Sequence, residues 1–419
     1  MSDLVDLSQY LRPGDHIVWG QACGEPTTLV EALIAQAEGI GHLSAFTASS
    51  FSGLLTPEAC SRFSLSSMGA IGALRPVAAA GKLGIVPCHV GQIGSFIEQG
   101  LIGCDVVFVQ LSPANSEGHH SLGLISDHVM AAVDKARVII AEVNDQVPFT
   151  YGDATLPAAR IDCRIRVSRP PVEVAAAAIS PTDEAIARHA AAYIGDGAVI
   201  QTGVGAVPDA ILRRLHDRKD LGVHSGMLGD GLVDLVEAGV ITNARKPIDQ
   251  GVSITGALIG TKRLYQFAHR NPAVAMRSSA YTHNEVVLTS LPNLVTINSA
   301  LEVDLTGQVN AEQSGSTYMG GTGGQLDYVR AGSRSPGGRA IIALPATAKG
   351  GKLSRITAAL SGPVTTARSE VDIIVTEYGA AELKGQTLVE RSRRLIAIAH
   401  PDFREELDRG ANLIRQRGF

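Results

Sequence analysis

The feature with the clearest chemical meaning is a glycine-containing turn, QTGVGAVPDAIL, at residues 201–212. It follows an apolar, strand-like run, and we expect Pro208 to open a helix after it. Gly203, Val204 and Gly205 would present backbone N–H groups to a ligand, and the helix N-terminus adds positive potential. The turn therefore predicts a site for a phosphate or for the oxyanion of a thioester under attack. An ordinary strand-to-helix turn is the alternative, and Pro208 argues against a dinucleotide fingerprint because it stands near the place of the third glycine.

A second glycine cluster, GGTGGQLD, occupies residues 320–327. Four glycines in five positions allow backbone conformations that other residue types adopt only at a cost. Gln325 and Asp327 follow directly, which suggests one wall of a binding pocket. A flexible loop is the alternative.

Polar side chains gather in the second half of the chain: His224, Ser225, Asp230, Asp234, Asn243, Asn298, Glu302 and Asp304. Glu302 and Asp304 lie two residues apart on a predicted strand, so both should face the same side. Such a pair could serve acid–base chemistry, but capping of a strand end explains it equally well. Cys23 could act as a nucleophile, although the sequence fixes no histidine that would activate it.

The elements that would position these residues alternate between short β-branched runs and helical stretches. The runs include HIVWG, DVVFVQL, RVIIAEV, NLVTINS, RAIIALP and DIIVTEYG. Strands that alternate with helices favour mainly parallel sheets. Residues 165–182 contain a proline pair and lose the alternation, so we place a domain junction there. We expect two similar α/β domains, at residues 1–170 and 180–419, with the glycine turns in the second and an amphipathic helix at the end.

The composition excludes several classes of function. A net charge of −5 argues against a nucleic-acid partner. Five widely spaced cysteines without a CxxC pattern favour free thiols in a reducing cytoplasm and give no metal site. No apolar run reaches the roughly 18 residues that a membrane-spanning helix needs. We therefore expect a cytoplasmic protein without a metal, a membrane segment or a nucleic-acid partner.

Taken in order along the chain, these segments resemble the acetyl-CoA hydrolase/transferase family, in particular its 4-hydroxybutyrate CoA-transferase branch. The matching segments are GDHIVWGQACGEPTTLVEAL, SPANSEGHHSLG, AEVNDQVPFTYG, QTGVGAVPDAIL, LGVHSGMLGDGLVDLVEAGVITN, INSALEVDLTGQVNAE, GGTGGQLDYVRA, VTEYGAAELKG and IAHPDFREEL. The resemblance implies two CoA-transferase-type α/β domains, an acyl-CoA substrate, and a homodimer or higher assembly. It assigns the oxyanion to the turn with Gly203, Val204 and Gly205. It places CoA beside a loop that contains Gly321, Gly323, Gly324, Gln325 and Asp327, and we add Asn298 to the substrate-binding candidates.

One position departs from this pattern. The family segment reads His-Thr/Ser-Glu-Met, and its glutamate attacks the acyl-CoA to form an anhydride and then a glutamyl-CoA thioester. Here the segment reads HSGM, with Gly226 at the position of the glutamate. Glycine has no side chain, so that route cannot run through residue 226. His224 and Glu302 are the candidates that remain for catalysis.

Three hypotheses follow. The chain hydrolyses an acyl-CoA, or cleaves a C–C bond of a keto-acyl-CoA, with His224, Glu302 or Asp327 handling protons. Alternatively it transfers CoA to a carboxylic acid, either through a substitute carboxylate such as Glu302 or in a chain whose glutamate was replaced. The third hypothesis is a non-catalytic acyl-CoA-binding pseudoenzyme.

Overall fold

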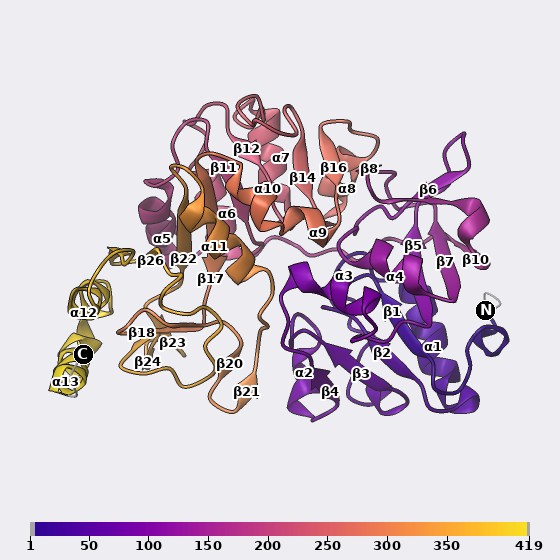
Figure 1. Cartoon of the computed structure of the whole chain (residues 1–419), viewed down its shortest axis with the longest axis horizontal. Helices are drawn as coiled ribbons and strands as arrows, with labels where there is room; N and C mark the ends of the chain where they lie inside the picture. Colours follow the sequence, from indigo (N-terminus) through magenta and orange to yellow (C-terminus); the bar gives the residue numbers. More distant parts are fainter. Residues whose placement is uncertain (1–4, 417–419) are drawn as a thin grey trace.

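The computed structural model describes residues 5–416, which form two α/β parts that lie next to each other in Figure 1. The first part is built on a seven-stranded sheet in the order β10-β7-β5-β1-β2-β3-β4, and every neighbouring pair is parallel. Its strands are β1 (His16–Trp19), β2 (Ser44–Phe46), β3 (Ser64–Ser67), β4 (Leu83–Ile85), β5 (Val106–Leu111), β7 (Val138–Asn144) and β10 (Cys163–Val167). Its helices are α1 (Thr27–Ile40), α2 (Arg75–Ala79), α3 (Val90–Glu98) and α4 (Val129–Lys135).

The central strand β5 shows why this sheet reads as continuous apolar runs. Val106 and Phe108 face a core shared with α1, whereas Val107 and Val109 face a core shared with α3 and α4. Successive residues of a strand point to opposite faces, and both faces are covered here. Every residue of β5 is therefore buried.

The second part is built on a six-stranded sheet in the order β12-β11-β17-β22-β26-β27. The first five strands are parallel, and β27 returns antiparallel to β26. The strands are β11 (Val199–Thr202), β12 (Gly222–Val223), β17 (Leu294–Ser299), β22 (Arg339–Ala343), β26 (Ile373–Thr376) and β27 (Gly379–Glu382). The helices are α5 (Pro181–Ala191), α6 (Ala206–Arg213), α7 (Asp230–Glu237), α8 (Lys262–Ala268), α9 (Ser279–Thr282), α10 (Glu285–Thr289), α11 (Gln325–Arg334), α12 (Leu388–Ala397) and α13 (Pro401–Gln416).

The remaining strands of the described residues form smaller groups. They are β6 (His119–Ser121) with β9 (Thr155–Pro157); β8 (Tyr151–Gly152), β14 (Ser253–Thr255) and β16 (Val274–Met276); β13 (Met227–Leu228) with β15 (Ala257–Leu258); β18 (Glu302–Asp304), β19 (Val309–Asn310) and β25 (Ile356–Thr357); β20 (Gln313–Ser314) with β21 (Thr317–Tyr318); and β23 (Thr347–Ala348) with β24 (Leu353–Ser354). Short 3-10 helices lie at Leu7–Gln9, Ala59–Ser61 and Ala158–Arg160.

The prediction of an α/β fold with mainly parallel sheets is confirmed, and α13 is the expected final helix. Residues 168–180 contain no helix or strand and connect the two large sheets. Ser180 then starts α5 through a capping box, in which its side chain accepts from the N–H of Asp183 and the Asp183 carboxylate accepts from the N–H of Ser180. One local prediction was wrong, because α6 begins at Ala206 rather than at Pro208.

The two parts meet along a seam to which the second glycine cluster contributes. The backbone N–H of Ala70 donates to the carbonyl of Gly320 (2.7 Å), and the N–H of Val90 donates to that of Gly323 (3.0 Å). A Cβ on Gly69 would lie 2.4 Å from the Gly320 carbonyl oxygen, so only glycine allows the two backbones to approach this closely. In Figure 1, β21 accordingly lies beside α2 at the seam.

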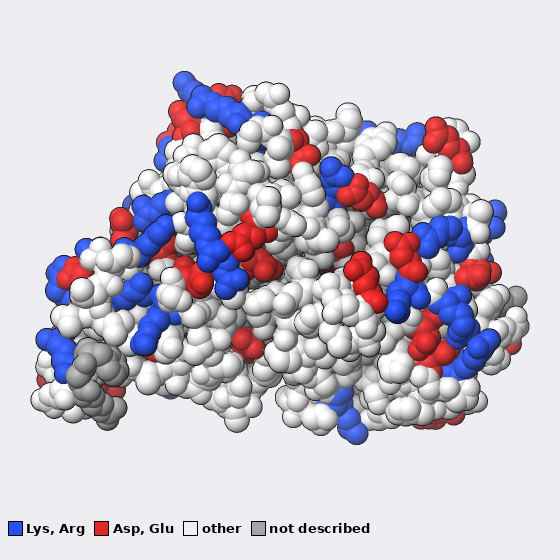
Figure 2. Space-filling view, viewed as in Figure 1, with Lys and Arg blue, Asp and Glu red and all other residues white. Residues whose placement is uncertain are grey.

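On the face shown in Figure 2, Lys and Arg side chains are interspersed with Asp and Glu, and no large area carries a single sign of charge. Arg334, for example, pairs with both Glu285 and Glu370. Among residues 5–416, no helix combines the length and the apolar character needed to cross a membrane.

Candidate active site

The predicted oxyanion turn lies directly against the segment that contains Gly226. The Ser225 hydroxyl donates to the Thr202 carbonyl (3.0 Å) and accepts from the Thr202 N–H (3.4 Å). Val204 approaches Gly229, whose Cβ would lie 3.4 Å from its side chain. Gly205 has a φ of 126°, a conformation that favours glycine, and it forms the N-cap of α6.

The turn also borders open space. A Cβ added at Gly203 or at Gly205 would meet no atom within 4 Å. A hollow of about 150 Å³ lies next to it, lined among others by Val204, Gly205, Gly229 and Ile259. The start of α6 therefore borders open space, and the assignment of an oxyanion to this turn stays a prediction.

The space beside Gly226 is filled by an imidazole. A Cβ at Gly226 would lie 2.7 Å from Cε1 and 2.9 Å from Nε2 of His283, and 3.1 Å from the hydroxyl of Tyr328. Real Cβ atoms do not approach other atoms this closely, so a side chain at residue 226 requires the His283 ring to move. Residue 226, the predicted position of a catalytic glutamate, thus does not face an empty gap.

Gly324, from the second glycine cluster, lies against the same ring. A Cβ at Gly324 would lie 2.5 Å from His283 Nε2. The imidazole is therefore held between two segments that are about 100 residues apart in the sequence. The Tyr328 ring packs beside it at 4.7 Å between centroids, and its hydroxyl donates to the Thr282 carbonyl (2.9 Å).

His283 was not among the residues singled out from the sequence. Its segment, AYTHNE, lacks a glycine turn and a recognisable spacing of functional groups. The missing side chain at Gly226 was visible in the sequence, but nothing indicated which residue occupies the space that it vacates. Only the packing of α9 against α3 and α10 brings His283 to this place.

The surroundings of His283 keep its imidazole neutral. Burial lowers its pKa to about 4, opposed by the negative charge of Asp127 and reinforced by His89. Burial by itself would raise the pKa of Asp127, but contacts with His128, His283 and Gln21 bring the net value below the usual range. The Asp127 carboxylate accepts from the Gln21 side-chain amide, whereas its Oδ1 is buried without a partner.

His224, a predicted catalytic residue, is fully buried. Neither of its ring nitrogens has a hydrogen-bond partner among residues 5–416, and the ring centroid lies 5.6 Å from that of Tyr281. Burial lowers the pKa of His224 to about 3. A neutral imidazole without solvent contact has no route for a proton, so the geometry gives no support to the predicted catalytic role of His224.

Glu302, the other catalytic candidate, is a buried residue of β18. Its carboxylate accepts from the Asn310 side-chain amide (2.8 Å) and from the backbone N–H of Ser361 (2.7 Å). The neighbouring Asp304 accepts from residues 306 and 308 of its own turn. Both carboxylates thus have the structural contacts that the alternative interpretation expected, and none of these contacts joins Glu302 to Gly226 or to His283.

Asn298 and Gln325 differ in how far their side chains are buried. Asn298 lies half-buried at the carboxyl end of β17 and donates to Gln201 at the end of β11 (3.2 Å), on the sheet edge from which the oxyanion turn emerges. Gln325, in contrast, is buried and satisfied, because it donates to the Ser299 carbonyl (2.6 Å) and accepts from the Thr366 hydroxyl (3.0 Å). We interpret Gln325 as a brace for the glycine cluster rather than as a group free to bind CoA.

Gly321 and Gly323 contact the first part of the chain, and Asp327 lies next to that seam. Gly321 bridges to Gly69. Asp327 stands near Gly91, and burial raises the pKa of its carboxyl to about 7. Its Oδ2 is buried without a partner. The predicted CoA loop therefore lies between the two parts of the chain, beside a carboxyl group with unused hydrogen-bonding capacity.

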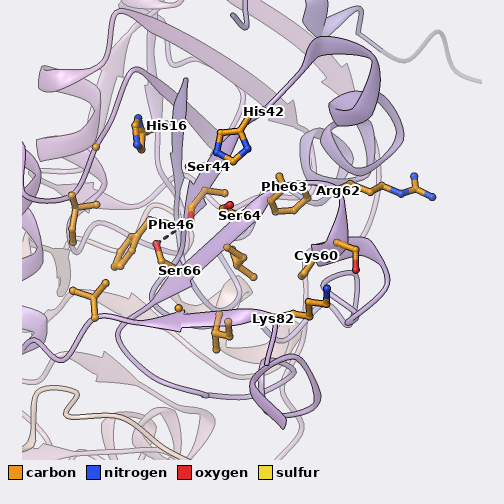
Figure 3. A pocket seen from close by; sticks show the side chains of 18 of the residues that line it. His16, His42, Ser44, Phe46, Cys60, Arg62, Phe63, Ser64, Ser66 and Lys82 are labelled. Carbon is orange, nitrogen blue, oxygen red and sulfur yellow. Dashed lines mark hydrogen bonds between the residues drawn. The ribbon is translucent and has the colours of Figure 1, made fainter. Parts of the chain in front are cut away.

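Another hollow among the described residues lies elsewhere. It has a volume of about 780 Å³ and lies along β1 to β4 of the first sheet, with His16, His42, Ser44, Ser64 and Lys82 among its lining (Figure 3). None of the predicted site residues lines it. All the residues that line it belong to the first part of the chain, so we treat it as a separate feature.

Cys23, the candidate nucleophile, is buried, and burial raises the pKa of its thiol to about 11. The thiol thus stays protonated near neutral pH, which disfavours nucleophilic attack. Within residues 5–416, no group of three or more His, Cys, Asp or Glu side chains is arranged to hold a metal ion.

Comparison with known proteins identifies relatives along the whole chain. A family model described as the acetyl-CoA hydrolase/transferase N-terminal domain matches residues 3–176, and one for the C-terminal domain of the same family matches residues 260–411. The chain is 40% identical over 395 residues to the 4-hydroxybutyrate coenzyme A transferase of Clostridium kluyveri, covering 93% of this chain and 92% of that protein. It is 33% identical over 417 residues to the succinyl-CoA:cyclohexane-1-carboxylate CoA transferase of Geobacter metallireducens, covering 97% and 94%. Among solved structures, RipA from Yersinia pestis superimposes with a TM-score of 0.92 at 34% identity, covering 98% of this chain and 96% of that one.

Proposed function

This chain belongs to the acetyl-CoA hydrolase/transferase family, and from that premise we propose that it is an acyl-CoA hydrolase. The observation that carries the proposal is the pairing of Gly226 with His283: residue 226 has no carboxylate, and an imidazole fills the space that a carboxylate would need. Without a nucleophilic side chain at residue 226, water is the simplest group to attack the thioester carbon.

The proposed substrate is an acyl-CoA thioester whose carbonyl lies against the turn with Gly203, Val204 and Gly205. The backbone N–H groups there, at the start of α6, would bind the oxyanion that forms when the carbonyl is attacked. Gly205 suits this role because it caps α6 and faces open space. Asn298 at the neighbouring strand end is proposed to orient the substrate.

CoA is proposed to extend along the seam formed by the glycine cluster. Gly321, Gly323 and Gly324 keep that loop close to the first part of the chain. Asp327 supplies a polar group there, whereas Gln325 braces the loop from behind. We further propose that the protein is a cytoplasmic homodimer or higher homo-oligomer, which size-exclusion chromatography with light scattering would test.

CoA transfer is the second candidate, favoured by the 40% identity to a protein named as a CoA transferase. It requires a carboxylate that can take up the acyl group. Asp127 and Asp327 each have a buried carboxylate oxygen without a partner near His283 or Gly91, so they are better placed for that role than Glu302.

A single assay separates these functions. The protein is incubated with a panel of acyl-CoA thioesters, with and without acetate or butyrate, and free CoA and new thioesters are measured by mass spectrometry. Hydrolysis predicts free CoA that forms without any carboxylic acid, whereas transfer predicts new thioesters that depend on it. Free CoA together with a shortened keto-acid fragment would indicate C–C cleavage. Tight binding without turnover would refute both enzymatic proposals in favour of a binding protein.

A further inference from the structure

We propose that His283 is the general base that activates water for thioester hydrolysis, with Nε2 as the atom that accepts the proton. This inference rests on the proposed hydrolase function and names the group that performs it. It assigns the catalytic role to His283, the C-cap of α9, rather than to the segment where the family resemblance predicts a glutamate.

The position of the ring is the first argument. Gly226 and Gly324 both present only backbone toward Nε2. A Cβ added to Gly226 would lie 2.9 Å from Nε2, and one added to Gly324 would lie 2.5 Å from it. Gly226 directly follows Ser225, which is hydrogen-bonded to Thr202 at the start of the oxyanion turn. The imidazole is therefore connected, through Gly226 and Ser225, to the turn where the thioester carbonyl is proposed to bind.

The hydrogen bonds of the ring provide the second argument, because they fix which nitrogen is basic. His283 Nδ1 lies 2.9 Å from the Thr282 hydroxyl oxygen. That hydroxyl donates its only hydrogen to the Ser278 carbonyl (3.2 Å). It must therefore accept from Nδ1–H, which leaves the lone pair of the neutral ring on Nε2.

Nε2 is also free to act. It makes no hydrogen bond with any described residue, and it is not among the fully buried polar atoms that lack a partner. The proposal requires that a water molecule reach it. An unpaired lone pair beside a site for a developing oxyanion is the arrangement that general-base catalysis requires.

The charged and titratable groups around the ring come from three segments. Asp127 approaches from the loop before α4, His89 caps α3, and Asp327 and Tyr328 lie on α11. Burial is the largest influence and lowers the pKa of His283 to about 4, with Asp127 acting in the opposite direction. The ring is consequently unprotonated throughout the neutral range.

The reaction balances without any further reagent. Nε2 takes a proton from water as the water oxygen bonds to the thioester carbon and the carbonyl electrons move to the oxyanion. When the tetrahedral intermediate collapses, the C–S bond breaks, and the departing CoA sulfur receives the proton from Nε2. One acyl-CoA and one water give one carboxylic acid and one CoA thiol.

The test compares His283→Gln with His42→Gln, an exposed histidine in the separate hollow along the first sheet. CoA release from the best acyl-CoA of the panel is measured with a thiol reagent. We expect His283→Gln to lower kcat by about 100-fold or more, the usual contribution of a general base, without a matching rise in KM. His42→Gln should leave both constants unchanged. The wild-type rate should stay level from pH 8 to pH 6 and fall only as Nε2 becomes protonated in acid.

His283→Ala provides a readout that a merely structural role would not move. Removing the ring leaves a cavity that imidazole can enter, so added imidazole should restore part of the lost kcat. If wild-type protein hydrolyses acyl-CoA and His283→Gln retains its kcat, the role of His283 is refuted while the hydrolase function stands. If wild-type protein releases no CoA from any thioester, the hydrolase function itself fails. If His283→Gln does not fold, rescue of His283→Ala by imidazole decides, and absence of rescue overturns the inference.

Discussion

A glutamate placed at residue 226, the predicted position of the family's nucleophile, should not support CoA transfer unless His283 is removed as well. A Cβ at residue 226 would lie 2.7 Å from His283 Cε1, about 0.8 Å closer than an ordinary carbon–carbon contact of about 3.5 Å. Relieving such a contact in a packed site typically costs about 1–3 kcal/mol. Gly226→Glu should therefore lower the free energy of unfolding by about that amount and acquire little CoA-transfer activity.

The double variant Gly226→Glu/His283→Ala should behave differently, because the carboxylate then has room beside the oxyanion turn. We expect transfer of CoA from acetyl-CoA to butyrate, detected as butyryl-CoA by mass spectrometry, at a rate well above that of either single variant. Gly39→Ala is the matched control for adding a side chain. Gly39 lies within α1, and a Cβ there would meet no atom within 4 Å, so this change should be neutral or stabilising.

A double-mutant cycle in urea unfolding isolates the contact. Gly226→Ala should cost about 1–3 kcal/mol when His283 is present and close to nothing in the His283→Ala background. Equal costs in both backgrounds would show that the ring does not occupy the space beside residue 226. Efficient CoA transfer by Gly226→Glu alone would refute the same reasoning. A double variant that binds CoA but exchanges nothing would show that residue 226 is not the position of the nucleophile.

Two further predictions concern residues that were candidates for catalysis. Glu302→Ala should lower the free energy of unfolding by about 2–3 kcal/mol, because the Ser361 N–H and the Asn310 amide lose a buried acceptor, while kcat per folded molecule stays unchanged in the CoA-release assay. Loss of kcat without loss of stability would instead indicate that Glu302 acts in catalysis. For His224, burial lowers the pKa from 6.5 to about 3. Between pH 6.5 and about pH 3, the unfolded chain therefore binds a proton at this residue that the folded chain does not bind. Folding stability should therefore fall as pH drops below 6.5, by up to about 1.4 kcal/mol per pH unit from this residue, and His224→Leu should flatten the decline in urea titrations at pH 7 and pH 5. An identical decline in both proteins would contradict this assignment.

Much of the fold could be predicted because its signals are local. Apolar runs such as residues 106–111 are strands buried on both faces, and Ser180 with Asp183 marks the start of α5 within the sequence itself. The start of α6 was placed two residues too late, since Pro208 tolerates any position in a first helical turn and Gly205 sets the actual boundary through its positive φ. Local chemistry identifies an element better than it locates its ends.

The site was predicted less completely because its decisive contacts join distant segments. The oxyanion turn and the glycine cluster were visible as sequence patterns, and the structure brings both to the neighbourhood of Gly226. His224 and Glu302 were chosen for their residue type, which carries no information about burial or about prior hydrogen bonds. His283 was missed because its importance arises only from what surrounds it in space.

Three glycines from three separate segments make room for that one imidazole. Gly226 and Gly324 border Nε2, and Gly91 of α3 borders the other end of the residue, with a would-be Cβ 3.1 Å from the Cβ of His283. None of the three has a positive φ, so backbone conformation does not explain why glycine stands at these positions. The volume of the His283 side chain explains why these positions are glycine. Glycine at residue 226 is thus one of several small residues, from both halves of the chain, that make room for the His283 imidazole. The chemistry of the site follows from this imidazole rather than from the side chain that residue 226 lacks.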